Sequence, residues 1–453
     1  MTAENVHPLR TTGSPAGRPA LRRCVSVPPE RFAAENWSRR PLLSVGGDYA
    51  DLFGLRAVDE LLTRRGLRTP FIRLAKDGAV IDPSRYTGPA GAGAEIADQV
   101  VDERVLQLFV DGATIVLQAL HRTWPPLVDF GQQLATDLGH PVQINAYVTP
   151  PQNQGFAAHY DVHDVFVLQV AGEKRWLIHE PVLEHPLRDQ PWNARAAAVA
   201  ARASEEPVID TVLRPGDALY LPRGWLHSAQ ALGETSVHLT VGVHPVTRHA
   251  LVDVLAALAA EVPALRESLP LGLDLDDPTA VAPELTAVVD ALSEWLHTAA
   301  GSAEGAAAVA DRLRARVRPQ SRPEPVPPLA QADAVALLGQ DSTVRLRRHL
   351  PCSPSCRADG SVVLRLPDRT LTLPALTAPA VKTLLSGVPV RVGELPGLDP
   401  DDRLVLVRRL LREAICVPFS EADAAGADVP ADGGAPADAG VVPAEPGRGG
   451  GAW

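Results

Sequence analysis

The sequence predicts a mixed α/β protein built around an antiparallel barrel or jelly roll. Between residues 141 and 246, short apolar runs alternate with turn residues, as in PVQINAYVTP (141–150) and SVHLTVGV (236–243). Several short strands at this spacing are typical of barrels and jelly rolls. Helical spacing of apolar residues in 123–139, and an Ala- and Leu-rich stretch from 247 to about 316, predict helices on either side of the barrel.

A chain of 453 residues suits two or three domains. Gly-, Pro- and Arg-rich residues at the start, and Ala-, Gly-, Pro- and Asp-rich residues at the end, predict disordered termini. A proline-rich linker at 321–328 precedes a compact helix-and-strand segment. We therefore expect a disordered arm (1–26), a barrel domain (27–246), a helical segment (247–320), a C-terminal domain (329–420) and a disordered tail (421–453).

Charge and cysteine content exclude several classes of protein. The 43 basic and 54 acidic residues give a net charge of −11, which argues against a protein that coats nucleic acid. Neither a signal peptide nor an apolar stretch of about 18 residues is evident, so we expect a cytoplasmic protein without a membrane span. Cys352 and Cys356 resemble half of a zinc site, but no second half follows, which favours reduced thiols.

Two of the expected strands carry polar faces without charge. Successive side chains of a strand point to opposite sides, so Gln143, Asn145, Tyr147 and Thr149 share one face. In the later strand Ser236, His238 and Thr240 do the same. A face open to solvent usually carries charged residues, so these faces indicate an enclosed, wet cavity inside the barrel.

The sharpest local pattern is His159-Tyr160-Asp161. In a strand, positions i and i+2 face the same way, so the imidazole and the carboxylate would point together. They would form half of a 2-His-1-carboxylate triad, which binds Fe(II) on one side and leaves positions open for O2 and a co-substrate. His227, after the apolar ALYL strand and the PRGW lip, is the favoured third ligand; the competing histidines are His163, His179, His185, His238 and His244.

Lys174 lies in GEKRWLIHEP, within a strand of large apolar residues, and is one of only three lysines in the chain. A lysine that points into a barrel needs an anion. The distal carboxylate of 2-oxoglutarate would supply it, with Thr240 or Tyr147 adding hydrogen bonds. The alternative is a hairpin lysine exposed to water.

Three stretches together resemble the Jumonji-C domain of the bacterial ribosomal oxygenase subfamily, within the cupin superfamily. They are NAYVTPPQNQGFAAHYDVHDVFVLQVAGEKRW, LRPGDALYLPRGWLHSAQA and SVHLTVGV, and the resemblance covers roughly residues 30–420. It includes an upstream F-x4-W…P-L-L motif at Phe32, Trp37 and 41–43. The joint pattern of HxD, GEKxW and PRGxxH is specific to this family.

The resemblance implies a double-stranded β-helix with Fe(II) held by His159, Asp161 and His227. It implies that Lys174 binds the C5 carboxylate of 2-oxoglutarate and that Asn145, Tyr147 and Thr240 line the co-substrate pocket. It further implies a helical dimerisation segment, and hence a homodimer, and a C-terminal winged-helix-like domain. The implied reaction is hydroxylation of a His or Arg side chain of a ribosomal protein, with 2-oxoglutarate and O2 consumed and succinate and CO2 released.

Some alternatives stay open at the level of sequence. Arg223 and Trp225, on the lip before His227, are candidate substrate contacts or ordinary loop packing. The same site could act on a small metabolite or on N-methyl lysine, or the barrel could be a non-catalytic metal-binding scaffold. The helix predicted from DDRLVLVRRLLREA (401–414) balances basic against acidic residues, so we expect no direct binding of nucleic acid.

Overall fold

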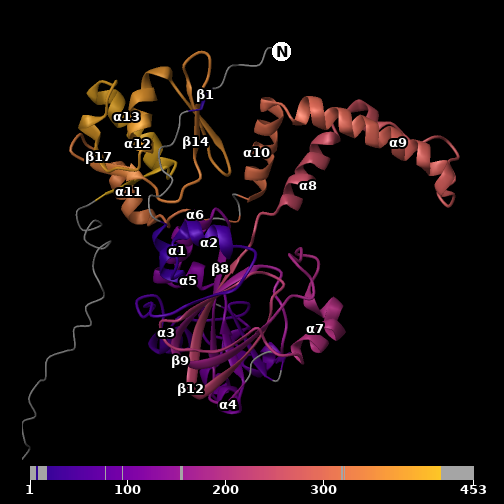
Figure 1. The fold of residues 1–453 in the computed structure, drawn as a ribbon. Helices are drawn as coiled ribbons and strands as arrows, with labels where there is room; N and C mark the ends of the chain where they lie inside the picture. Colours follow the sequence, from indigo (N-terminus) through magenta and orange to yellow (C-terminus); the bar gives the residue numbers. More distant parts are fainter. Residues whose placement is uncertain are drawn as a thin grey trace, which may run out of the picture.

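The computed structural model describes residues 7–8, 18–76, 78–93, 95–153, 157–317, 320 and 322–419. Figure 1 shows three parts: a β-rich domain with the N-terminal helices, a projecting helical arm, and a smaller C-terminal domain. The predicted disorder at 1–6, 9–17 and 421–453 lies outside the described residues. No helix among the described residues combines the length and the apolar character needed to cross a bilayer.

The β-rich domain is organised by an antiparallel sheet of nine described strands in the order β2-β11-β9-β12-β8-β7-β3-β4, with β10 paired to β9. A large antiparallel sheet inside a mixed α/β chain agrees with the predicted fold class. The strands are β2 (Leu42–Ser44), β3 (Ile72–Lys76), β4 (Ala79–Val80), β7 (Thr114–Leu117), β8 (Val142–Thr149), β9 (Asp164–His179), β10 (Ile209–Leu213), β11 (Ala218–Leu221) and β12 (Leu226–Val243).

The strand β9 corrects one expectation from the sequence. The Ala171–Gly172 pair between VFVLQV and EKRWLIHEP predicts a turn that would separate two strands, but β9 continues through it. Gly172 has a φ of +62°, and a Cβ there would lie 2.3 Å from the carbonyl oxygen of Thr235. The register of the partner strand β12 shifts beside this point, between Leu232 and Val237. The glycine therefore bends one long strand, as residues at β-bulges commonly do, and does not end it.

Helices pack on this sheet around one large apolar core. Leu127, Phe130 and Leu134 of α6, which the helical spacing predicted to share a side, are buried in that core. The helices are α1 (Pro19–Cys24), α2 (Pro29–Glu35), α3 (Leu55–Arg64), α4 (Asp102–Val110), α5 (Leu120–Thr123) and α6 (Pro125–Leu138), and the chain also forms a short β5–β6 ladder (Thr87–Gly88, Gln99–Val100). The helix α7 (Ala196–Ala203) packs separately, through Val199 in a small cluster with Tyr160 and Leu226.

The helix α1 contradicts the expectation of a disordered arm as far as residue 26. Ala20, Leu21 and Cys24 are buried in the core, and the Leu21 amide donates to the Asp137 carboxylate of α6 at 3.0 Å. The polar and proline-rich context masked a short apolar face that becomes visible only when α6 is present to cover it.

The upstream Phe-Trp-Pro-Leu-Leu motif serves the barrel wall. The Phe32 ring meets Tyr220 of β11 edge-on at 4.9 Å, and Trp37 stacks on the same ring at 6.0 Å. Leu42 and Leu43 pair in β2 with β11. The motif therefore closes one edge of the sheet, next to the lip that leads to His227.

The helical arm consists of α8 (Arg248–Ala259), α9 (Pro278–Trp295), a π turn at Leu296–Ala300 and α10 (Ala303–Val317). None of the described residues of α9 or α10 is buried. Figure 1 shows α9 extending away from both globular parts. The apolar side chains of Leu285, Val288 and Val289 on α9 stay 60%, 43% and 50% exposed, so the arm has an uncovered apolar surface.

The C-terminal domain has a core of its own, formed by buried residues between Leu338 and Cys416. Its elements are α11 (Pro328–Ala336), β13 (Thr343–Leu346), β14 (Ser353–Cys356), β15 (Val362–Arg365), β16 (Thr370–Leu373), α12 (Ala378–Leu385), β17 (Val390–Arg391), α13 (Pro400–Arg412) and β18 (Cys416–Pro418). The strands form a β14-β15-β16 sheet, to which β1 (His7–Pro8) adds an edge, and a β17-β13-β18 sheet. Its resemblance to a winged helix stays a prediction.

Candidate active site

The structure brings His159, Asp161 and His227 together. Ligand atoms of all three lie within 4.8 Å of one another, and the residues line a cavity of about 260 Å³ in the barrel. His227 Nε2 lies 3.7 Å from Asp161 Oδ2, and the two imidazole centroids are 4.5 Å apart. Two imidazoles and one carboxylate converging in this way match the 2-His-1-carboxylate donor set of non-haem Fe(II) sites.

The backbone orients both imidazoles for metal binding. His159 Nδ1 lies 2.7 Å from the Ala157 carbonyl oxygen, and His227 Nδ1 lies 3.1 Å from that of Trp225. A carbonyl can only accept, so Nδ1 carries the proton in each ring and Nε2 keeps the lone pair that a metal needs. Burial, and then the neighbouring His159, lower the pKa of His227 to about 4, so its imidazole is neutral at physiological pH.

The carboxylate is ready to act as the anionic donor. Burial alone would raise the pKa of Asp161, but the neighbouring His163, His227 and His159 outweigh it and lower that pKa. Asp161 is therefore ionised at neutral pH. The site offers one carboxylate and two imidazole nitrogens, a donor set that suits a divalent cation.

The local backbone differs from the strand that the sequence predicted for His159 and Asp161. They lie in an extended segment just before β9, and His159 forms an isolated antiparallel bridge with His227 at the start of β12. The His227 amide donates to the His159 carbonyl at 2.9 Å, and the His159 amide donates back at 3.2 Å. This reciprocal pair connects the two histidines through the main chain, so their ring positions depend on each other.

Lys174 lies inside the cavity and is not exposed at a hairpin. It is 4% exposed, and its Nζ donates to Thr149 Oγ1 at 3.0 Å. Burial lowers the pKa of this amine to about 7. No carboxylate among the described residues pairs with it. A buried ammonium group without a counter-ion is costly, so the cavity is suited to receive an anionic group at this end.

Of the other predicted co-substrate residues, Tyr147 and Thr240 line the cavity and Asn145 does not. Asn145 Oδ1 instead accepts a hydrogen bond from the Ala119 amide at 3.0 Å. Ala119 has a φ of +57°, and the asparagine holds the chain there, where α5 begins. Asn145 therefore supports the wall next to the cavity.

The sequence reasoning missed Arg73, and it placed Thr149 and His238 on polar strand faces without assigning either of them a contact in the site. Arg73 of β3 reaches the cavity and hydrogen-bonds to Tyr147. The His238 ring stacks on Tyr147 at 5.0 Å, and burial lowers the pKa of His238 well below its usual value. The sequence did carry a signal for Arg73, because it is a charged residue within the apolar strand FIRLAK (71–76). The same kind of signal identified Lys174.

The candidate substrate residues Arg223 and Trp225 do not line this cavity. The Arg223 guanidinium lies 3.3 Å from Asp164 Oδ1 in a buried ion pair, and the same carboxylate accepts from Tyr220 Oη at 2.6 Å. Trp225 packs against a small apolar cluster around Trp176. These contacts correspond to the loop-packing alternative and hold the lip that leads to His227.

The remaining competing histidines lie outside the donor set. His163 meets His244 edge-on at 5.4 Å, and His179 Nε2 lies 3.2 Å from the Glu205 carbonyl oxygen. Among the described residues, His159, Asp161 and His227 form the one cluster of at least three possible ligands.

Comparison with known proteins agrees with this site. Residues 129–251 match the family model of the JmjC domain. The chain is 31% identical over 256 residues to chicken (Gallus gallus) ribosomal oxygenase 1, a match covering 55% of this chain and 40% of that protein. It is 29% identical over 257 residues to the bifunctional lysine-specific demethylase and histidyl-hydroxylase NO66 of Drosophila persimilis, covering 53% and 35% respectively.

Among solved structures, the fold is similar to that of the Escherichia coli ribosomal oxygenase YcfD. The TM-score is 0.51 at 16% identity, and the match covers 87% of this chain and 99% of that one. A second structure of YcfD, in complex with cobalt and succinic acid, matches with a TM-score of 0.50 over 88% of this chain and 99% of that one. At this identity the likeness concerns the fold.

Residues 129–251 thus match the JmjC domain, and this matched region contains all three residues of the His-Asp-His site. The chicken relative and the E. coli structural neighbour are named ribosomal oxygenases, and the Drosophila relative is named a bifunctional demethylase and histidyl-hydroxylase. The matched region spans about two fifths of the length of the chicken relative.

Proposed function

We propose that this protein is an Fe(II)- and 2-oxoglutarate-dependent oxygenase that hydroxylates a His or Arg side chain of a ribosomal protein. The observation that carries the proposal is one cavity that holds both the His159–Asp161–His227 donor set and the buried amine of Lys174. A metal held by the donor set would bind the keto-acid end of 2-oxoglutarate. The Lys174 amine would bind the carboxylate at its other end. The E. coli neighbour solved with cobalt and succinic acid supports the same pairing of metal and dicarboxylate.

Each group has a defined part in this proposal. His159, Asp161 and His227 would hold Fe(II), and Lys174 would bind the distal carboxylate of 2-oxoglutarate. With 2-oxoglutarate, iron supplies the chemistry that activates O2 and inserts one oxygen atom into a C–H bond while succinate and CO2 are released. Tyr147, oriented by Arg73, and Thr240 would position the co-substrate by hydrogen bonds.

The walls of the cavity would protect the reaction from bulk water. Trp176 and His238 meet edge-on at 5.4 Å, and Val165 and Val167 line the same side. Aromatic and branched apolar side chains exclude water and strengthen the ionic contact at Lys174. Trp192, which is 37% exposed and lies 6.3 Å from the His159 ring, is the candidate first contact for an entering substrate side chain.

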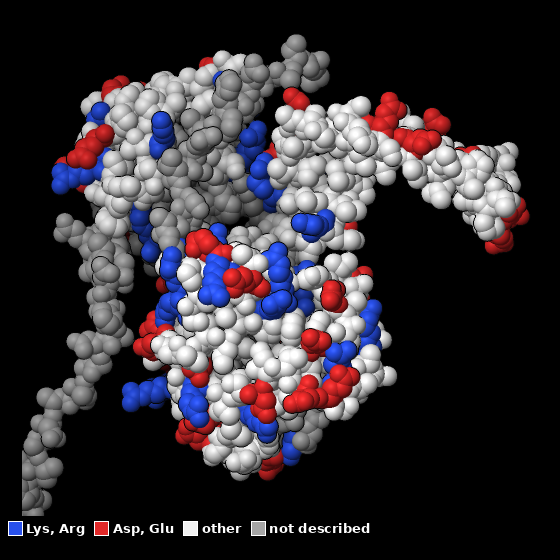
Figure 2. Space-filling model, viewed as in Figure 1, with Lys and Arg blue, Asp and Glu red and all other residues white. Residues whose placement is uncertain are grey.

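The helical arm is our candidate for the homodimer interface. Figure 2 shows few charged side chains along much of its visible surface, with acidic groups mainly near α9. The exposed apolar residues of α9 would be covered by a second copy. Light scattering of the full chain tests this: a dimer that becomes a monomer in Val288→Asp/Val289→Asp supports it, and a monomeric wild type overturns it.

Two measurements test the enzymatic proposal. Purified protein with Fe(II) should convert 2-oxoglutarate to succinate, and Asp161→Ala should not. Intact-mass spectrometry should then find one ribosomal protein lighter by one oxygen atom in a strain that lacks the gene, with the mass restored by the wild type and not by Asp161→Ala.

The two measurements separate the chemistry from the substrate. Succinate formation without any change in a ribosomal protein mass would support the oxygenase activity. The substrate would then be a metabolite or another protein, including a protein that carries N-methyl lysine. Metal binding without binding of 2-oxoglutarate would favour a non-catalytic scaffold. The cytoplasmic location and the absence of direct nucleic-acid binding stay predictions. Both are compatible with a ribosomal protein as the substrate.

A further inference from the structure

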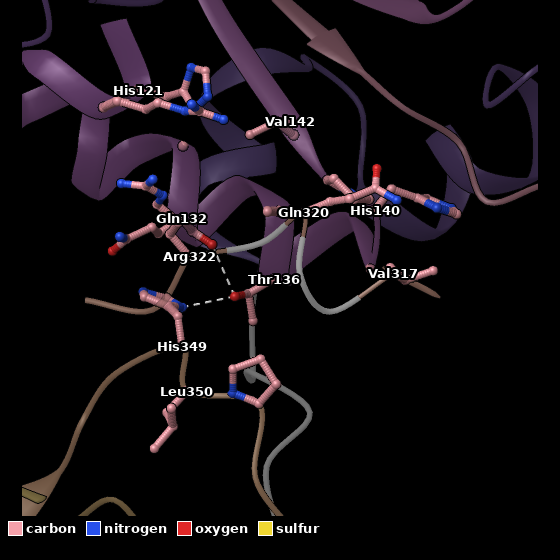
Figure 3. A pocket seen from close by; sticks show the side chains of 16 residues that line it. His121, Gln132, Thr136, His140, Val142, Val317, Gln320, Arg322, His349 and Leu350 are labelled. Carbon is pink, nitrogen blue, oxygen red and sulfur yellow. Dashed lines mark hydrogen bonds between the residues drawn. The ribbon is translucent and has the colours of Figure 1, made fainter. Parts of the chain in front are cut away.

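A second cavity, of about 410 Å³, lies between the barrel domain and the C-terminal domain. Figure 3 shows its walls: Gln132 and Thr136 come from α6, and His349 and Leu350 come from the C-terminal domain. Gln320 and Arg322, from the segment that connects the two parts, close it. The volume is within the range of sites for small molecules, roughly 300–1,000 Å³.

The charged groups of this cavity are all basic. Arg122 and Arg322 line it, and no Asp or Glu is among its described lining residues. Both arginines are exposed to solvent, and within the described part of the chain neither has an ion pair or hydrogen bond from its side chain. The nearby Arg345 and Arg348 behave differently, because both pair with Glu324, at 2.6 Å and 3.0 Å.

The positive potential of these arginines reaches the interior of the cavity. His121 Nδ1 accepts a hydrogen bond from the Ile144 amide at 3.0 Å, so its ring is held in the wall. Burial, then Arg122 and, more weakly, Arg322, lower the pKa of His121 to about 4. With Nδ1 accepting, the neutral ring carries its proton on Nε2 and keeps one N–H donor.

Further hydrogen-bonding groups line the cavity beside the arginines. The Thr136 hydroxyl and His349 Nδ1 are 2.8 Å apart, across the boundary between the two domains. Gln132 Nε2 donates to the Pro323 carbonyl of the connecting segment at 2.9 Å. The walls thus combine two guanidinium groups with hydroxyl, amide and imidazole groups, and no carboxylate is among the described lining residues.

We propose that this cavity binds a small oxyanion-bearing molecule, with its phosphate or carboxylate groups held by Arg122 and Arg322. Guanidinium groups bind both kinds of oxyanion through paired N–H donors. The cavity is lined by Arg122 of the barrel domain, Arg322 of the connecting segment and His349 of the C-terminal domain, so a molecule bound there would fasten the C-terminal domain onto the barrel. This site is separate from the proposed Fe(II) site and needs neither the metal nor 2-oxoglutarate.

A small molecule fits better than a nucleic-acid chain. The cavity is bounded by both domains and by the connecting segment, whereas single-stranded RNA needs a continuous basic groove with aromatic stacking partners. Its described lining includes no Phe, Tyr or Trp.

Isothermal titration calorimetry of the full chain with pyrophosphate and with citrate tests the proposal, at constant ionic strength set with chloride. We expect saturable binding of at least one probe, weakened about tenfold or more by Arg122→Gln and by Arg322→Gln. Which probe binds distinguishes a phosphate-bearing from a carboxylate-bearing ligand. Arg56→Gln, on the exposed surface of α3, is the matched control and should bind as the wild type does.

The second readout is the attachment of the C-terminal domain. A bound probe should slow amide hydrogen exchange at residues 343–351 in the wild type and not in Arg322→Gln. Absence of saturable binding overturns the proposal, as does equal weakening by Arg56→Gln. Binding of an RNA oligonucleotide that depends on Arg122 and Arg322, without binding of either probe, also overturns it in favour of a nucleic-acid contact.

Discussion

Replacing Lys174 by methionine should have opposite effects on stability and on co-substrate binding. The amine is 4% exposed, and burial lowers its pKa from 10.5 to about 7. The unfolded chain therefore keeps this proton up to a higher pH than the folded protein does. Burying the protonated amine therefore lowers the stability of the folded protein. This cost has its full value below pH 7 and decreases as the pH rises from about 7 to about 10.5.

Below pH 7 this cost amounts to at most about 5 kcal/mol. Methionine has a similar length and no charge, so Lys174→Met removes the cost. We expect the ligand-free variant at pH 6.5 to melt at least about 2 °C above the wild type, with the difference shrinking as the pH approaches 9. Thermal unfolding followed by circular dichroism at several pH values measures this.

The same substitution removes the partner of the distal carboxylate. A hydrogen bond to a charged group contributes about 1.5–3 kcal/mol, so the KM for 2-oxoglutarate should rise about 10- to 150-fold. Succinate formation against 2-oxoglutarate concentration gives the value, and Lys76→Met, at an exposed lysine, is the control. A KM within about twofold of the wild type would refute the assignment of Lys174 as the co-substrate anchor.

Three further substitutions test the metal site and the scaffold that carries it. Asp161→Ala should abolish succinate formation, because it removes the anionic donor of the triad. Gly172→Ala should destabilise the protein by more than about 1 kcal/mol, because an L side chain at this positive φ also meets backbone at 2.3 Å. Asp164→Asn should destabilise it by about 3–5 kcal/mol, because its arginine partner would keep a buried charge without a counter-ion. Chemical denaturation measures the two stability changes.

Matched controls separate these causes. Gly233 has the same φ of +62° with nothing within 4 Å of its Cβ position, so Gly233→Ala should cost less than Gly172→Ala. Asp210 pairs with Arg175 on the surface, where solvent screens the two charges, so Asp210→Asn should cost much less than Asp164→Asn. Equal costs within either pair would contradict the reasoning, and near wild-type turnover in Asp161→Ala would show that the metal assignment is wrong.

Local patterns determined much of the fold and half of the site. Alternation in 142–149 and 236–243 predicted strands with an enclosed polar face, and helical spacing predicted α6 with its buried side. The HxD spacing identified His159 and Asp161, and the rarity of lysine drew attention to Lys174. Such inferences succeed because the conformation of a short segment, and the face to which each side chain points, depend on neighbours in the sequence.

Only the tertiary structure decided which of these faces meet. The main-chain bridge between His159 and His227 joins residues far apart in the chain and selects His227 over the competing histidines. The same long-range packing brings the Ala119 amide to Asn145, which accepts its hydrogen bond, and buries Arg223 in an ion pair with Asp164. The basic cavity between the domains likewise exists only where α6 and the segment around His349 meet. The partner of a polar group depends on which distant segment packs against it, and no periodicity within one segment records that.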